Sequence, residues 1–316
     1  MSAETAVTTE PAAVAYPGDT PVSEISTLKG AASGQSQLRR NLKRFLIGNK
    51  LNLVGLIIVV IFFILAIFGQ MLAPHDPYAQ DITGSKLLGP SLTHPLGTDE
   101  LGRDLLSRVM TGTRISLQVA AVVLTFAVVF GTLVGSVAGY FGGIVDELLM
   151  RFTDMFLAFP ALILAIAIAA SLGRELHWTM IALATVFWPW YARLVRGQIL
   201  TIRERDYVTA AESIGLSGPR LLLKHILPNA VSVVIIQLTL DVGYAILATS
   251  SLSFIGLGAQ PPSPEWGTMM STARNYFREA WWYTTFPGLA LTLTVFAFNV
   301  LGDGLQDALD PRSGRR

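Results

Sequence analysis

The sequence contains no cysteine among its 316 residues. This absence excludes disulfide frameworks, thiolate nucleophiles, cysteine-based zinc sites and iron–sulfur clusters. Histidine is scarce too, and the four residues are His75, His94, His177 and His225. No two of them have the i, i+4 spacing that places two imidazoles on one helix face. We therefore expect no metal site built by this chain.

A phosphate-binding loop of the form Gly-x-x-x-x-Gly-Lys-Ser/Thr is also missing, so the sequence predicts no nucleotide site and no cofactor in the chain. Charge is sparse: Asp, Glu, Lys and Arg make up only 14% of the residues, against about 25% in soluble domains. The net charge of +1 gives no electrostatic footprint for nucleic acid. Hydrophobic residues reach 52%, so we expect most of the chain to lie in membrane lipid.

Long apolar runs account for this composition. A bilayer core about 30 Å thick needs about 20 apolar helical residues. Six stretches qualify, at residues 51–72, 116–140, 150–172, 179–195, 230–252 and 286–301. Pro160 and Pro189 interrupt two of them and allow bends. The sequence therefore predicts an all-α, polytopic membrane protein with six transmembrane helices.

The distribution of lysine and arginine predicts the orientation. With the N-terminus inside, the cytoplasmic pieces hold 16 of these residues and the outer pieces hold 7. Because positive side chains are retained on the cytoplasmic side, we expect a multi-pass cell-membrane protein with both termini inside. Residues 1–38 contain no apolar run and are predicted to be a disordered cytoplasmic tail. Residues 306–316 are predicted to be a second cytoplasmic tail.

The cytoplasmic stretch at residues 196–228 is long enough for two short helices. Residues 207–214 suit a helix, Gly215 is placed to end it in a left-handed turn, and residues 217–219 can start the next helix. Ala210 and Ala211 leave a nearly flat patch that could fit a groove of a partner. From the residues alone, an ordinary pair of surface helices is an equal alternative.

This stretch resembles the cytoplasmic signature of binding-protein-dependent ABC importer permeases: Glu-Ala-Ala, three residues, Gly, nine residues, then Ile-x-Leu-Pro. The residues that fall on this spacing are Ala210, Ala211, Gly215, Leu227 and Pro228. Thr209 stands where glutamate is usual, and His225 where isoleucine is usual. Three further blocks, at residues 94–108, 252–267 and 301–312, resemble the C-type permease subunit of the dipeptide, oligopeptide and nickel branch of this family.

The resemblance implies a type I ABC importer permease fold with a cytoplasmic coupling helix. Its first transmembrane helix and basic flank would span residues 39–73, an extracytoplasmic segment 74–115, and the permease core 116–305. The coupling helix would lie within residues 200–228, and its segment from Tyr207 through Thr209 to Gly215 would seat in an ATPase. The chain itself would not be an enzyme.

The implied partners are a homologous B-type permease subunit, two cytoplasmic ATP-binding subunits or domains, and an extracytoplasmic solute-binding protein. ATP and Mg²⁺ would be bound by the ATPase partners. The implied function is the import of di- or oligopeptides by alternating access. Nickel chelates and glutathione-like solutes, carried by relatives in the same branch, remain alternatives.

Two features lie inside the predicted spans. Gly131, Gly135 and Gly139 recur every four residues, which lets another helix approach closely, within the chain or across a permease pair. Asp241 lies halfway along the fifth predicted span, where an aspartate costs about 2.5–3.5 kcal/mol. It must face protein or water, and a wall of the translocation pathway and a packing contact are equal alternatives. A proton-coupled transporter is disfavoured because Asp241 has no relay of further acids.

Charged residues also gather near the start of the third predicted span. They are Asp146, Glu147, Arg151 and Asp154. Their spacing predicts a local cluster of i, i+4 pairs that anchors the helix, with no role toward a substrate.

Overall fold

The structure is a computed structural model that describes residues 50–216 and 218–309. Every named element in these residues is a helix, and a single isolated β-bridge joins Thr98 to Asp104. The all-α prediction is therefore confirmed. The predicted N-terminal tail, the basic flank up to residue 49 and residues 310–316 of the predicted C-terminal tail lie outside the described residues.

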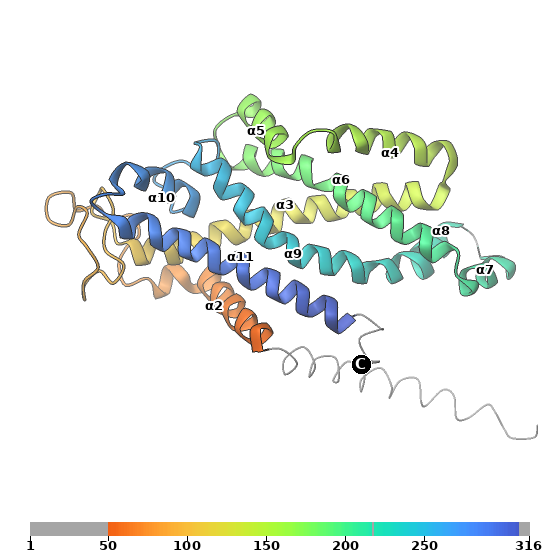
Figure 1. Cartoon of the computed structure of the whole chain (residues 1–316), viewed down its shortest axis with the longest axis horizontal. Coiled ribbons are helices and arrows are strands. Elements are labelled where there is room, and N and C mark those ends of the chain that lie inside the picture. The colour runs from red at the N-terminus through yellow and green to blue at the C-terminus, as the bar shows by residue number, and fades with distance from the viewer. Residues whose placement is uncertain (1–49, 217, 310–316) are drawn as a thin grey trace, which may run out of the picture.

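Most of the long helices run along one axis, with short helices and irregular segments at the two ends (Figure 1). The helices are α2 (Lys50–Leu72), α3 (Leu105–Phe141), α4 (Gly143–Leu157), α5 (Ala161–Leu172), α6 (Leu176–Arg203), α7 (Asp206–Ser213), α8 (Gly218–Leu221), the π-helical η1 (Leu222–Ile226), α9 (Leu227–Phe254), α10 (Trp266–Ala273), the 3-10 helix η2 (Arg274–Tyr276) and α11 (Trp281–Leu309).

Four helical stretches are long and apolar enough to cross a membrane: α2, α3, the run 218–254 that ends in α9, and α11. The pair α4 and α5 passes the same test together, which gives up to five spans in the described residues. Helix α6 contains the predicted fourth span but is not among them, because its Trp, Tyr, Pro and Arg residues lower its apolar character. Six transmembrane spans are therefore reached only if α6 also crosses the membrane, with its polar residues packed against neighbouring helices and away from lipid.

The third predicted span is not one helix beginning at residue 150. It begins at Gly143 in α4 and breaks before α5, which runs at 83° to α4. Pro160 stands at this break with φ −57° and ψ 124°, an extended conformation, and it offers no backbone N–H to a preceding turn. Pro189 has a different outcome, because α6 continues through it from Leu176 to Arg203.

Helices α3 and α6 form the centre of the bundle. Along α6, side chains at successive turns are fully buried, among them Tyr191, Val195 and Ile199. These residues belong to one hydrophobic core that also includes apolar side chains of α3 and α9. The outward sides of α2 and α3 expose large apolar residues, as expected for helices in lipid.

The irregular residues 73–104 form a cap at one end of the bundle, beside α10 (Figure 1). The cap is pinned by buried polar groups: Arg103 Nε donates to Asp99 Oδ2 at 2.6 Å, and Trp282 Nε1 donates to the Thr98 carbonyl at 3.2 Å. Helix α3 begins at Leu105, well before the predicted residue 116. The reason is Asp104, whose side chain accepts the Ser107 N–H as an N-cap.

Candidate functional site

Helix α7 lies at the end of the bundle opposite the cap, next to α8 (Figure 1). It spans Asp206–Ser213, one residue earlier than the predicted 207–214. Gly215 follows with φ +85°, the left-handed conformation expected at this position, and its N–H donates to the Glu212 carbonyl at 2.9 Å. A short, sharply ended helix is therefore presented at this end of the molecule.

The two alanines of α7 do not form one patch. Ala211 is only 9% exposed and, with Val208 at 1%, faces the core of the chain itself. Ala210 is exposed, and it shares the outward side of the helix with Tyr207 and Thr209. The reason is helical geometry, since residues 208 and 211 are three apart and lie on one side. The expected flat surface of both alanines is wrong in this respect, because of the two only Ala210 is exposed.

The end of the signature starts the next long helix. Leu227 begins α9 and is half-buried, whereas Pro228 is exposed in its first turn. The preceding five residues, Leu222–Ile226, form a π-helical turn that joins α8 to α9 without a break. The segment from α7 to Pro228 is thus attached directly to the long helix that carries Asp241.

Asp241 faces protein. Its Oδ2 accepts a hydrogen bond from the Tyr191 hydroxyl at 2.7 Å, and its Oδ1 accepts one from Gln237 Nε2 at 2.9 Å. Tyr191 belongs to the buried face of α6, so the carboxylate joins α9 to α6. These bonds leave capacity on both oxygens, since an ionised carboxylate offers about four lone-pair sites.

The same carboxylate also lines a cavity of about 540 Å³. The cavity lies between α6 and α9, with α5 at its edge, and its lining residues are Ala161, Val186, Phe187, Trp190, Arg193, Leu194, Gln237, Asp241 and Tyr244. One acidic and one basic side chain therefore stand in an otherwise mostly apolar wall. Asp241 therefore makes a packing contact and also lines this cavity, and its role as a wall of the translocation pathway stays a prediction.

Gly131, Gly135 and Gly139 lie against α6 at three successive turns. A Cβ atom would stand 2.5 Å from the Trp188 carbonyl oxygen at Gly131 and 2.3 Å from the Ala192 carbonyl oxygen at Gly135. At Gly139 the nearest atom would be the Arg196 carbonyl oxygen, at 3.1 Å. The glycines thus meet α6 within the chain, in a fixed register of four residues on both helices.

The charges of α4 form pairs across helices. Arg196 of α6 donates from Nε and Nη2 to the two oxygens of Asp146, each at 2.6 Å. Arg193 of α6 donates to Asp154. Only Arg151 and Glu147 form the predicted i, i+4 pair. The interpretation as a purely local cluster is wrong, because two of the acids hold α4 against α6.

The histidines also differ from expectation. His75 and His94, although far apart in sequence, lie with their ring centroids 4.8 Å apart and their planes tilted by 34°, and both face the carboxylate of Asp104. Helix spacing does not detect this cluster, because it is formed by the cap and not by one helix. The signal that was present is the density of polar residues in the 94–108 block, which contains two of the three side chains.

Two parts of the chain match families of known proteins. Residues 131–315 match the family described as the binding-protein-dependent transport system inner membrane component. Residues 36–90 match the N-terminal TM domain of oligopeptide transport permease C. The two matches together extend over most of the chain.

Individual relatives are similar over nearly their whole length. The probable D,D-dipeptide transport system permease protein DdpC of Escherichia coli (strain K12) is 45% identical over 293 residues, covering 92% of this chain and 98% of that protein. The dipeptide transport system permease protein DppC of Alkalihalophilus pseudofirmus is 46% identical, covering 84% and 86%. The glutathione transport system permease protein GsiD of Escherichia coli O6:K15:H31 is 44% identical, covering 80% and 84%.

Proposed function

The chain belongs to the family of binding-protein-dependent transport system inner membrane components, and from this membership we propose that it is the permease subunit of an ATP-driven importer of di- or oligopeptides. It is a multi-pass membrane protein. Relatives whose names specify dipeptide transport support the peptide substrate. The positive charge bias supports a cytoplasmic location for both termini and for α7.

The observation that carries this proposal is the exposed outer side of α7. A helix of eight residues that buries only Val208 and Ala211 is too short to be stable alone and gains its order from packing. Its other side is exposed and includes Tyr207 at 42%, and Ile214, directly after α7, is 79% exposed. Exposed Tyr207, Ala210 and Ile214 among polar neighbours fit a groove on a partner, and in this function the partner is an ATP-binding subunit.

ATP hydrolysis belongs to partner subunits in this proposal. The sequence has no phosphate-binding loop of the Walker type, so ATP and Mg²⁺ would bind to the ATPases. A homologous permease would supply the second half of the pathway, and an extracytoplasmic binding protein would deliver the solute. Alternating access would follow when closure of the ATPases moves α7 and, through Pro228, helix α9.

The cavity beside Asp241 gives this pathway a chemical preference. A peptide carries an ammonium group, which the Asp241 carboxylate can accept as a charge-assisted hydrogen bond. The aromatic and aliphatic residues of the wall leave room for side chains of different size. The contact would therefore recognise the ammonium group that peptides have in common, and it would not select a particular peptide sequence.

Because the chain has no cysteine, a single introduced cysteine can be cross-linked selectively, and we predict that such a cross-link identifies the partner of α7. When Ala210→Cys is labelled with a benzophenone maleimide and irradiated, the photoreactive group is expected to capture an ATP-binding subunit, because residue 210 is exposed on α7. Val208→Cys is the matched control: its side chain is 1% exposed, so it should give no adduct. Gel analysis and mass spectrometry of the adduct identify the captured protein. Failure of Ala210→Cys to capture an ATPase in transport-competent membranes would contradict the proposal.

We predict that Asp241→Asn lowers peptide uptake into proteoliposomes about 10-fold, the effect of losing a hydrogen bond to a charged group. Asparagine keeps an acceptor for Tyr191, so the fold should persist. Tyr191→Phe serves as the control, since it removes one hydrogen bond to Asp241 but leaves the charge, and it should cost less uptake. Equal uptake by Asp241→Asn and the wild type would remove Asp241 from the pathway.

The alternatives differ in what they predict for the same preparation. A proton-coupled transporter would continue uptake without ATP and stop when the proton gradient collapses. Glutathione-like solutes are a specific alternative, because a relative named for glutathione transport is 44% identical. Mass spectrometry of the solute released by the cognate binding protein separates peptides from glutathione and from metal chelates.

A further inference from the structure

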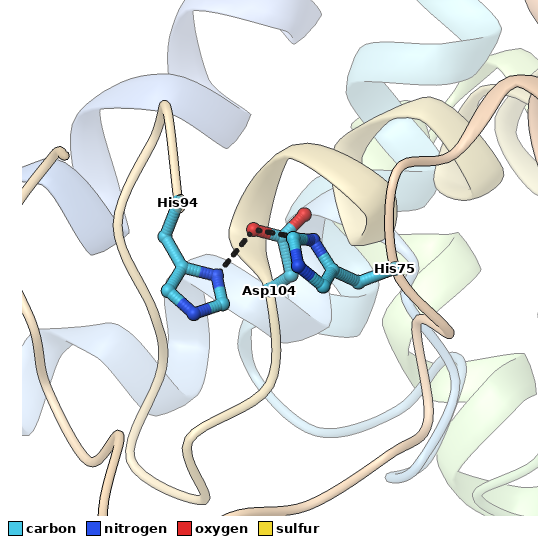
Figure 2. Close-up of side chains that lie close together, drawn as sticks. All are labelled: His75, His94 and Asp104. Carbon is cyan, nitrogen blue, oxygen red and sulfur yellow. Dashed lines mark hydrogen bonds and ion pairs between the residues drawn. The ribbon is translucent and has the colours of Figure 1, made fainter. Parts of the chain in front are cut away.

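The cap holds three potential metal ligands that belong to no part of the proposed transport function. His75 follows α2, His94 stands in the middle of the cap, and Asp104 is the N-cap of α3 (Figure 2). Their nearest ligand atoms all lie within 4.8 Å of one another. We propose that these side chains bind one zinc-type divalent cation, which would fasten the cap to the start of α3.

The distances between the ligand atoms lie near those of a zinc site. Asp104 Oδ1 lies 2.9 Å from His94 Nδ1 and 3.7 Å from His75 Nδ1. Two ligands bound to zinc at about 2.1 Å stand roughly 3–3.5 Å apart, at angles between square and tetrahedral. The observed distances lie on both sides of this range. The three ligand atoms lie within 4.8 Å of one another, so the His75 ring, whose side chain is 43% exposed, would have to move closer for all three to bind one ion.

The second oxygen of Asp104 is already fixed. Oδ2 accepts hydrogen bonds from the Ser107 N–H at 2.8 Å and from the Ser107 hydroxyl at 2.6 Å. The Ser107 hydroxyl in turn accepts the backbone N–H of His75 at 3.1 Å. Such outer contacts orient a metal-binding carboxylate and leave its other oxygen directed at the ion. The first turn of α3 thus positions two of the three ligands.

Charge favours a cation at this point. The Asp104 side chain is 1% exposed, and among residues 50–216 and 218–309 its only ion-pair partners are the two histidines. With neutral imidazoles, its negative charge is stabilised by the N-terminus of α3, by the Ser107 hydroxyl and by the hydrogen bond between His94 Nδ1 and Oδ1, and no full positive charge pairs with it. A divalent cation would neutralise the buried carboxylate and would also be coordinated by the lone pairs of the two imidazole nitrogens. Entry is open, because the rings of His75 and His94 are 43% and 16% exposed.

The donor set selects the kind of metal. Two imidazole nitrogens and one carboxylate oxygen suit zinc and its neighbours in the transition series, whereas Mg²⁺ and Ca²⁺ prefer oxygen ligands alone. Three protein ligands leave a further position for water. The site is independent of any transported solute, because its ligands lie in the cap and not along the cavity beside Asp241.

The test measures zinc bound to the full-length chain, purified in detergent through a tag that lacks histidine. After exposure to Zn²⁺ and removal of the free ion, the wild type should retain about one zinc per chain, and Mg²⁺ or Ca²⁺ should not displace it. His75→Ala should weaken zinc binding at least 10- to 100-fold in competition with a chromophoric chelator, the range already caused by changes outside the ligands themselves. His75 is exposed, so this variant should fold.

His177→Ala is the matched control. It removes another exposed histidine, which has Glu175 beside it but belongs to no cluster of three ligands among the described residues. This variant should retain zinc as the wild type does. Zinc should also raise the melting temperature of the wild type and of His177→Ala, and not that of His75→Ala. Equal zinc retention by the wild type and His75→Ala, or no retention by the wild type, overturns the proposal.

Discussion

A chain with Ala210→Arg is expected to fold and reach the membrane but to lose peptide uptake and substrate-stimulated ATPase activity by roughly 30-fold, equivalent to about 2 kcal/mol at the centre of an interface. Ala210 is exposed on α7, so the long side chain disturbs nothing within the chain. It occupies the space that a partner groove would need. Uptake and ATPase activity are measured on the purified complex in proteoliposomes.

Ala210→Ser is the control for this experiment, because it is polar but small and should keep nearly full activity. Ala211→Arg is not an equivalent test. That residue is 9% exposed and packs with Val208 against the core, so an arginine there would unfold α7 for reasons unrelated to coupling. Wild-type uptake by Ala210→Arg would end the proposed role of α7.

Gly135→Ala is expected to destabilise the protein by about 3 kcal/mol or more, the upper range for overpacking. The new Cβ would stand 2.3 Å from the Ala192 carbonyl oxygen, and a backbone atom inside a packed helix cannot move aside alone. Helices α3 and α6 must separate, and the core between them opens. The loss of stability is measured by heating the detergent-solubilised protein and determining the fraction that stays folded at each temperature.

Gly197→Ala provides the comparison within α6. A Cβ at Gly197 meets no atom within 4 Å, so the added methyl group should be neutral or should stabilise the helix by about 0.5–1 kcal/mol. Equal stability of Gly135→Ala and the wild type would show that the contact between α3 and α6 is looser than the structure has it.

Local patterns predicted the parts of the fold that depend on nearby residues. The helices of the bundle follow from long apolar runs, and α7 was placed within one residue because Gly215 ends it. The late start predicted for α3 has a local cause too: residues 105–115 are not a continuous apolar run, although the Asp104 side chain caps the helix directly before them. Hydropathy alone finds the part of a helix that lies in lipid, not the part that lies beyond it.

The contacts that the sequence did not predict all join distant segments. Arg193 and Arg196 are 39 and 50 residues from their acidic partners on α4. His75 and Asp104 are separated by the whole cap. Which residue of a charged cluster finds which partner depends on how helices pack, and spacing along one helix carries no information about that. The split of Ala210 from Ala211 has the same origin, because it requires knowing which side of α7 faces the core.

The glycine contact between α3 and α6 also limits how the molecule can change shape. Backbones that touch at three successive turns cannot slide past each other, and the pairs of Arg193 and Arg196 with α4 bind a third helix to the same unit. These three helices are therefore expected to turn as one rigid body, and the helical chain next breaks at Pro160, between α4 and α5. Helix α7 follows α6 after two residues. A displacement of α7 would therefore move α3, α4 and α6 together.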